Sequence, residues 1–244
     1  MARHIQYLFI VLLAFFSHGW TDELQMAMVP DPVIFTRADE IHLSEISSDK
    51  TRKMIFDMKE YATHLREEKQ FSLIGLSAPE VGIDKRIILI DTAYNGDEKK
   101  LGPLKAYINP QIIWYSNEIE EDKECCLCVD QHISGVIVRS KHIKIIAFDA
   151  LGRTICEELS GMPARAFQHA VDHLEGICFP ERVHGQHNLH WVDEELFALY
   201  QTHWKTWPIS CSWSVWLAMK LDMPYYYLLP QSYPVDLLLN FYDQ

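Results

Sequence analysis

Two histidines four residues apart, His169 and His173, limit what this chain can fold into more than any other feature. The apolar spacing around them predicts a helix over residues 163–175, with Gly176 just past its end. On a helix, residues i and i+4 lie on the same face, so both imidazoles can bind one cation. Helical zinc hydrolases carry a glutamate directly after the first histidine, and this chain has Ala170 there. With twelve histidines in the chain, the spacing alone is weak evidence for a metal site.

The cysteines strengthen that hypothesis. There are six of them, which is too few and too unevenly spaced for a disulfide scaffold. Three crowd into the stretch ECCLCV, which favours a metal site or a reactive thiol over paired bridges. One cysteine thiolate together with two histidines would make a three-ligand catalytic site with a fourth position left for water. The six are Cys125, Cys126, Cys128, Cys156, Cys178 and Cys211.

Composition and charge narrow the class of protein. Of the 244 residues, 48% are hydrophobic and 23% are charged, which is sufficient for a globular core. The net charge of −12 argues against nonspecific binding to nucleic acid or to an anionic membrane. The apolar run over residues 5–16 is too short to span a bilayer, which needs about 20 residues. Residues 1–22 therefore read as a targeting segment, either a signal peptide ending near Ser17 and Gly19 or a mitochondrial presequence.

Periodicity predicts several further elements. Residues 49–69 have the spacing of an amphipathic helix, and residues 86–92 and 105–115 are typical of strands. Residues 135–159 are interpreted as one hairpin, with its turn near Asp149. We expect the main domain to occupy residues 23–184. The aromatic-rich extension over 185–244, with thirteen aromatic residues, is expected to pack onto that domain or to bind a partner protein.

A third stretch, IGLSAPEVGI at 74–83, has small residues that allow close backbone approach to a ligand. Together and in order, GLSAPE at 75–80, ECCLC at 124–128 and QHAVDHL at 168–174 resemble the three motifs of peptide deformylases. The resemblance covers about residues 27–184. It implies an α+β fold in which antiparallel β-sheets wrap around a central metal-binding HxxxH helix. The departures within the motifs resemble the third, trypanosomatid-type branch of the family.

The resemblance also implies a metal site and a reaction. It makes Cys126, His169 and His173 the metal ligands, with Fe²⁺ as the usual ion and Zn²⁺ or another divalent metal as alternatives. The family removes the formyl group from N-formylmethionyl peptides. Water activated by the metal attacks the formyl carbon, and the backbone N–H of Leu127 steadies the oxyanion. The segment made of Ile74, Gly75 and Leu76 is expected to line the methionine pocket and to pair with the peptide backbone.

Two departures from the family pattern affect catalysis directly. Ala170 replaces the glutamate that moves the proton, and Glu80 replaces the glutamine that donates to the oxyanion. Losing a general acid/base typically costs about 10²–10⁴ in rate, and losing one oxyanion donor about 10²–10³. One hypothesis restores the chemistry: Glu80 is a relocated base, or a protonated donor whose pKa is raised by burial. Asp172 is expected to anchor the helix by pairing with a basic residue such as Arg139.

Three functions therefore remain open on the sequence. The first is a divergent deformylase whose activity is impaired. The second is a metal-holding pseudoenzyme that binds N-terminal methionine peptides, or a partner protein through the extension. A redox or metal-sensing protein that uses Cys125, Cys126 and Cys128 is the third. The family implies a mitochondrion or a plastid for a eukaryotic owner, and the trypanosomatid-type branch favours the mitochondrion. The signal-like N-terminus favours the secretory pathway instead.

Overall fold

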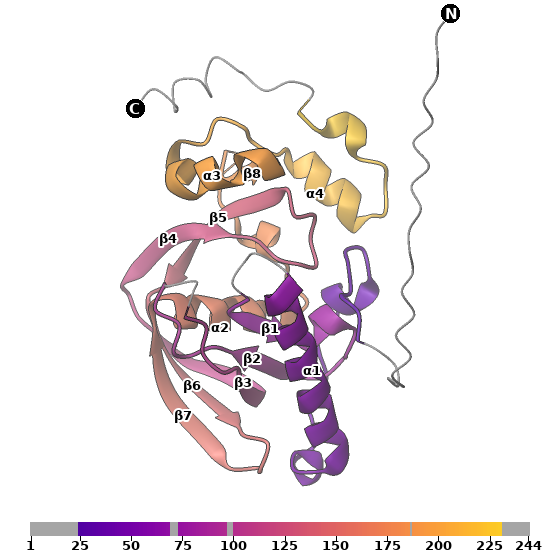
Figure 1. Ribbon diagram of the computed structural model, residues 1–244, viewed down its shortest axis with the longest axis vertical. Coiled ribbons are helices and arrows are strands. Elements are labelled where there is room, and N and C mark those ends of the chain that lie inside the picture. The colour runs from indigo at the N-terminus through magenta and orange to yellow at the C-terminus, as the bar shows by residue number, and fades with distance from the viewer. Residues whose placement is uncertain (1–23, 69–72, 97–99, 186, 231–244) are drawn as a thin grey trace, which may run out of the picture.

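The computed structural model describes residues 24–68, 73–96, 100–185 and 187–230. The predicted targeting segment over residues 1–22 lies outside these ranges. Two antiparallel sheets enclose a central helix, and further helices cover their outer faces (Figure 1). The α-helices are α1 (Asp49–Glu68), α2 (Gly161–Leu174), α3 (Phe197–His203) and α4 (Trp213–Lys220). The strands are β1 (Gly75–Ser77), β2 (Ile87–Ile90), β3 (Lys105–Tyr115), β4 (Ile119–Glu124), β5 (Ile133–Ser140), β6 (His142–Phe148), β7 (Thr154–Ser160) and β8 (Leu189–Trp191).

The larger sheet has the strand order β1-β2-β3-β6-β7, and the smaller sheet has the order β4-β5-β8. The predicted strands near 86–92 and 105–115 are β2 and β3, so both predictions are confirmed. The prediction of a single hairpin over residues 135–159 is wrong. A turn at Asp149–Gly152 does join β6 to β7, but β5 lies in the other sheet. Hydrophobic periodicity marks strands without showing which sheet a strand joins, and this ambiguity explains the error.

Strand β2 places apolar side chains on both faces of the larger sheet. Ile87 and Leu89 belong to a core shared with α1, whereas Ile88 and Ile90 belong to a second core shared with α2. Successive residues of a strand point to opposite faces, so a strand covered on both sides is apolar throughout. All four side chains are fully buried. The sheet is therefore a layer between two helices, and α2 lies on its inner side.

Helix α2 is the central element that the sequence predicted, beginning two residues earlier than expected. It contacts strands of both sheets, with β1, β2 and β7 on one side and β5 on the other (Figure 1). Its buried apolar residues Ala164, Phe167, Ala170 and Leu174 follow the spacing of one helix face. The α+β arrangement of antiparallel sheets around the HxxxH helix is thus confirmed.

The C-terminal extension packs onto the smaller sheet. Strand β8 pairs with β5, and Trp191, Tyr200 and Trp216 share a core with Cys128 and other residues of the main domain. Figure 1 shows α3 and α4 beside this sheet, on the side away from α1. Among the described residues, no helix is long and apolar enough to cross a membrane. The expected boundary between residues 184 and 185 stays a prediction.

Replacing Gly176 by Ala is expected to destabilise the protein strongly. Gly176 ends α2 with φ of +72°, and a Cβ there would lie 2.7 Å from the carbonyl oxygen of Phe35. The left-handed conformation costs a side-chain-bearing residue about 1–2 kcal/mol, and steric overlap adds about 1–3 kcal/mol. The free energy of unfolding, measured with urea, should fall by about 2–4 kcal/mol.

The matched control for that substitution is Gly152→Ala. Gly152 has φ of +77°, but a Cβ at this position meets nothing within 4 Å. Only the conformational cost of about 1–2 kcal/mol applies to it. Equal losses in the two variants would contradict a close approach between the end of α2 and Phe35.

Candidate metal centre

Helix α2 brings its two histidines together as the spacing predicts. The Nε2 atoms of His169 and His173 lie 3.2 Å apart. The Nδ1 atom of His169 lies 2.9 Å from a carboxylate oxygen of Glu124. Because a carboxylate can only accept, Nδ1 donates the proton, and in the neutral imidazole this leaves the lone pair of His169 on Nε2. This second contact fixes the ring in the tautomer that a metal ligand needs.

The loop after β4 adds the cysteine. The Sγ atom of Cys126 lies 3.3 Å from Nε2 of His173, and the Cys126 side chain is almost fully buried. Donors at about 2.0–2.3 Å from one tetrahedral ion lie about 3.4–3.7 Å from each other. The two measured separations are within a few tenths of an ångström of that range. The residues present therefore fit a divalent cation, and the structure brings together Cys126, His169 and His173.

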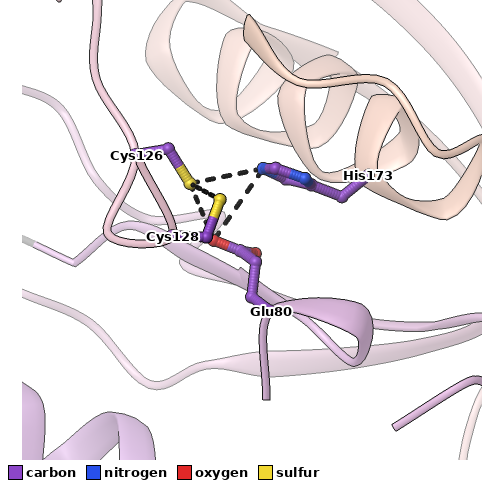
Figure 2. A group of neighbouring side chains, drawn as sticks. All are labelled: Glu80, Cys126, Cys128 and His173. Carbon is purple, nitrogen blue, oxygen red and sulfur yellow. Dashed lines mark hydrogen bonds and ion pairs between the residues drawn. The ribbon is translucent and has the colours of Figure 1, made fainter. Parts of the chain in front are cut away.

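A second donor group overlaps the first. Glu80, Cys126, Cys128 and His173 each offer one ligand atom, and these atoms all lie within 4.8 Å of one another (Figure 2). The Sγ atoms of Cys126 and Cys128 are 3.0 Å apart. Cys125, which precedes them, is exposed and does not belong to the group. Cys126 and Cys128 thus form a buried pair within this donor group, while Cys125 lies outside it.

Glu80 is held beside the thiol of Cys126. Its Oε2 atom accepts hydrogen bonds from both the backbone N–H and the hydroxyl of Ser77, each 2.7 Å long. Its Oε1 atom lies 3.2 Å from Sγ of Cys126 and 3.9 Å from Nε2 of His173. Burial, followed by the charge of Cys126, raises the pKa of the Glu80 carboxyl. One carboxylate oxygen is anchored and the other faces the donors.

The electrostatics of the cysteine pair are unequal. Burial raises the pKa of Cys126, but the hydrogen bond from Cys128 and the charge of His173 outweigh it, so this pKa is well below its usual value. The hydrogen bond to Cys126, then that to Cys178, and then burial raise the pKa of Cys128 well above its usual value. Cys126 is thus the thiolate of the pair.

Position 170 carries no proton-transfer group. Ala170 is buried, with 2% of its surface exposed, and it packs in the core between α2 and the larger sheet. Ala170 follows His169 directly in the sequence and precedes His173 by three residues. Of the residues singled out at the centre, Glu80 is the one carboxylate that faces the donor atoms directly.

Behind His169 lies a buried network of charges. Glu124 accepts hydrogen bonds from Nε and Nη2 of Arg139, at 3.0 and 2.9 Å, and from Nη1 of Arg165 at 2.7 Å. Arg139 also donates to Asp172 over 2.6 Å, so the predicted pairing of Asp172 with Arg139 is confirmed. Burial alone would raise the pKa of Glu124, but the hydrogen bonds from Arg139 and His169 hold it well below its usual value. An ionised Glu124 therefore orients the imidazole of His169.

Three residues that hold His169 and Glu80 in place were not predicted from the sequence. Glu124 stands inside the cysteine motif, but its role as the anchor of His169 has no local signature. Arg165 lies four residues before His169, and this helical spacing could have placed it on the same face. Ser77 lies three residues before Glu80, and the turn over Pro79–Val81 brings the two together.

The predicted substrate-binding residues lie on strand β1 and just before it. Gly75 and Leu76 pair with β2, and the carbonyl oxygen of Ile74 accepts a hydrogen bond from Asp91. A Cβ at Gly75 would lie 3.8 Å from Cβ of Ala166 on α2, so this strand runs close to the helix that carries the histidines. Strand β1 is the outer strand of its sheet, and within the described part of the chain no strand pairs with its second edge. Leu127, on the loop between the two cysteines, is half-buried. The roles of these residues stay predictions.

Comparisons with known proteins agree with this architecture. A family model described as polypeptide deformylase matches residues 24–188. The chain is 31% identical over 164 residues to a peptide deformylase of Shouchella clausii, covering 64% of this chain and 86% of that protein. It is 35% identical over 154 residues to a peptide deformylase of Thermotoga neapolitana, covering 63% of this chain and 82% of that protein.

Solved structures give the same result. A class I type b peptide deformylase from Acinetobacter baumannii with bound Met-Ala-Ser has a TM-score of 0.58 and 28% identity, covering 67% of this chain and all of that chain. The peptide deformylase of Thermotoga maritima has a TM-score of 0.57 and 33% identity, covering 68% of this chain and all of that chain. Fold and donor set together define a metal-site α+β protein of the hydrolase type. The chain belongs to the peptide deformylase family. The assignment to its trypanosomatid-type branch stays a prediction.

Proposed function

We propose that this protein is a metal-dependent deformylase of N-formylmethionyl peptides whose rate is strongly reduced. The observation that carries the proposal is the convergence of Cys126, His169 and His173 within the family fold, beside an alanine at position 170. When bound, a divalent metal polarises the formyl oxygen and makes water more acidic. The residues of the chain must then hold the peptide and move the proton.

The identity of the metal is part of the proposal. A donor set of one thiolate and two imidazoles suits Fe²⁺ and Zn²⁺ alike. Fe²⁺ is proposed as the working ion, with Zn²⁺ as the alternative. Metal analysis of the protein purified without added metal tests this, since iron at one equivalent agrees with it and zinc at one equivalent contradicts it.

Strand β1 is proposed to hold the peptide. Its unpaired edge can accept an extended peptide as an additional antiparallel strand, and main-chain hydrogen bonds would supply affinity. Ile74, Gly75 and Leu76 lie on this strand or next to it, and they are proposed to line the pocket for the methionine side chain. The Acinetobacter baumannii relative binds Met-Ala-Ser, so formyl-Met-Ala-Ser is a suitable substrate for assays.

Glu80 is proposed to move the proton in place of the missing glutamate. It faces Cys126 at 3.2 Å, and Ser77 fixes its orientation. A carboxyl group with a raised pKa is better matched to proton transfer near neutral pH than an ordinary glutamate. The backbone N–H of Leu127 is proposed to donate to the oxyanion.

Substituting Gln for Glu80 is expected to remove the residual turnover. The amide cannot accept the proton, and loss of a general base typically costs about 10²–10⁴ in rate. Formate release from formyl-Met-Ala-Ser measures the effect, with metal content determined in the same samples. The exposed Glu118→Gln substitution is the control and should leave turnover unchanged. A gain of turnover in Glu80→Gln would show that Glu80 obstructs the reaction instead of assisting it.

A binding protein is the alternative function, and the burial of Ala170 favours it. With no acid/base at that position, the centre can hold a metal and a methionine peptide without turning it over. The exposed aromatic residues of the extension, such as Tyr226 and Tyr227, offer a surface for a protein partner. Unformylated Met-Ala-Ser that binds to the metal-loaded protein, with no formate released from its formylated form, would favour this alternative.

Location is proposed to be mitochondrial, because the family's substrates are made where translation starts with formylmethionine. The secretory pathway is the alternative, since the N-terminal segment is signal-like. Imaging of the full chain with a C-terminal tag distinguishes the two. A secreted product would place the formylated substrates out of reach and favour the binding protein.

A further inference from the structure

Cys128 is the buried thiol that the proposed reaction does not use. It is fully buried, and its Sγ atom lies 3.0 Å from Sγ of Cys126. It belongs to the donor group with Glu80, Cys126 and His173, in which every ligand atom lies within 4.8 Å of the others (Figure 2). Two donors on opposite sides of one ion can be at most about 4.6 Å apart, when both bonds are about 2.3 Å long. The four atoms therefore lie within about the span of one coordination sphere, and the two Sγ atoms would separate by about 0.7 Å to reach the spacing of two thiolates on one tetrahedral ion.

We infer that Cys128 is a second thiolate ligand of the metal, beside Cys126. The loop from Cys126 to Cys128 makes a turn that brings both thiols to the same side, with the backbone N–H of Val129 bonded to the carbonyl oxygen of Cys126. His173 reaches the same point from α2. The sphere then holds Cys126, Cys128 and His173, and His169 completes it, which leaves Glu80 beside the ion as the proton-transfer group.

A divalent cation would be bound by both thiols as thiolates, because a coordinating thiol is deprotonated outright. The second thiolate then offsets the charge of the ion in the buried site.

Two thiolates change the character of the centre. Soft sulfur ligands suit Fe²⁺ and Zn²⁺ more than harder ions such as Mg²⁺. Four protein donors would close a tetrahedral sphere and leave no open position for water. Cys128 is thus a further cause of the slow rate proposed above, but its ligation does not depend on any turnover.

The first test counts sulfur ligands in the unaltered protein. X-ray absorption at the zinc edge of the reduced, zinc-loaded full chain should show two sulfur neighbours at about 2.3 Å. A single sulfur neighbour overturns the inference. Thiol titration before the measurement excludes oxidised protein, in which a disulfide between Cys126 and Cys128 would expel zinc. Since this readout is independent of deformylation, it separates failure of the inference from failure of the proposed function.

The second test assigns the sulfur atom to Cys128. In the cobalt-loaded protein, the sulfur-to-cobalt charge-transfer absorbance per bound ion should fall by about half in Cys128→Ser and in Cys128→Ala. Cys211→Ser is the matched control, because Cys211 is buried in the same core as Cys128 and lies outside the donor group, and its absorbance should not change. Full absorbance in both Cys128 variants overturns the assignment. If a Cys128 variant no longer binds cobalt, the number of sulfur neighbours measured by X-ray absorption in the unaltered protein decides whether the inference holds.

Discussion

Ala170→Glu is expected to raise the deformylation rate by at least about 10²-fold. Position 170 lies between the two helical histidines, one residue after His169 and three before His173. A carboxylate there restores the proton-transfer group, and general acid/base catalysis typically contributes about 10²–10⁴ in rate. Steady-state formate release from formyl-Met-Ala-Ser measures the gain, expressed per bound metal.

Two controls accompany this substitution. Ala170→Gln places a side chain of the same size and shape as glutamate at position 170, but the amide cannot take a proton. Its deformylation rate should therefore stay near that of the native protein. The double variant Ala170→Glu with Glu80→Gln shows whether the restored glutamate makes Glu80 dispensable, because the effects on rate of two groups that serve one function do not add. If Ala170→Glu is folded and metal-loaded but gains less than tenfold, the missing glutamate is not what limits the rate.

Arg139→Met is expected to cause a large loss of stability. Arg139 is buried, and its guanidinium bridges Glu124 on β4 and Asp172 on α2. Removing one partner of a buried ion pair typically costs about 3–5 kcal/mol, because the remaining charge stays buried. Arg165 still reaches Glu124 and Arg182 still reaches Asp172, so we expect about 3 kcal/mol from urea unfolding.

The surface pair of Lys141 with Glu118 is the matched control for Arg139. Its side chains are 41% and 57% exposed, and such pairs contribute about 0–1 kcal/mol. Lys141→Met should therefore change the free energy of unfolding by less than about 1 kcal/mol. Arg139→Met should also weaken metal binding, because Glu124 orients His169. A loss as small as that of the control would contradict the network's role in joining β4 to α2.

The sequence predicts the centre of the molecule better than its edges. The HxxxH spacing, with Gly176 as a stop, predicts α2 to within two residues, and charge pairing predicts the contact between Asp172 and Arg139. These features depend on local spacing or on one strong interaction. The contact of Ser77 with Glu80 depends on a short turn and was not foreseen.

Contacts between distant segments account for most of what the sequence did not predict. Strand β5 was assigned to the hairpin that follows it, whereas it pairs with β4 before it and with β8 after it. Strand β8 has three residues, which are too few for hydrophobic periodicity to predict a strand. These residues form a strand because they pair with the edge of β5. The closeness of the thiols of Cys126 and Cys128 likewise follows from the shape of a loop, which residue spacing does not determine.

We propose that the site made of Cys126, His169 and His173 still binds its metal while proton transfer is impaired. Formate release from formyl-Met-Ala-Ser by the native protein, loaded with one equivalent of Fe²⁺ under anaerobic conditions, tests it most directly. His173→Ala, which lacks a metal ligand, provides the baseline. We expect slow turnover by the native protein that is clearly above this baseline and is lost when the metal is chelated. If the native protein binds its metal but turns over no faster than His173→Ala, the proposal is wrong.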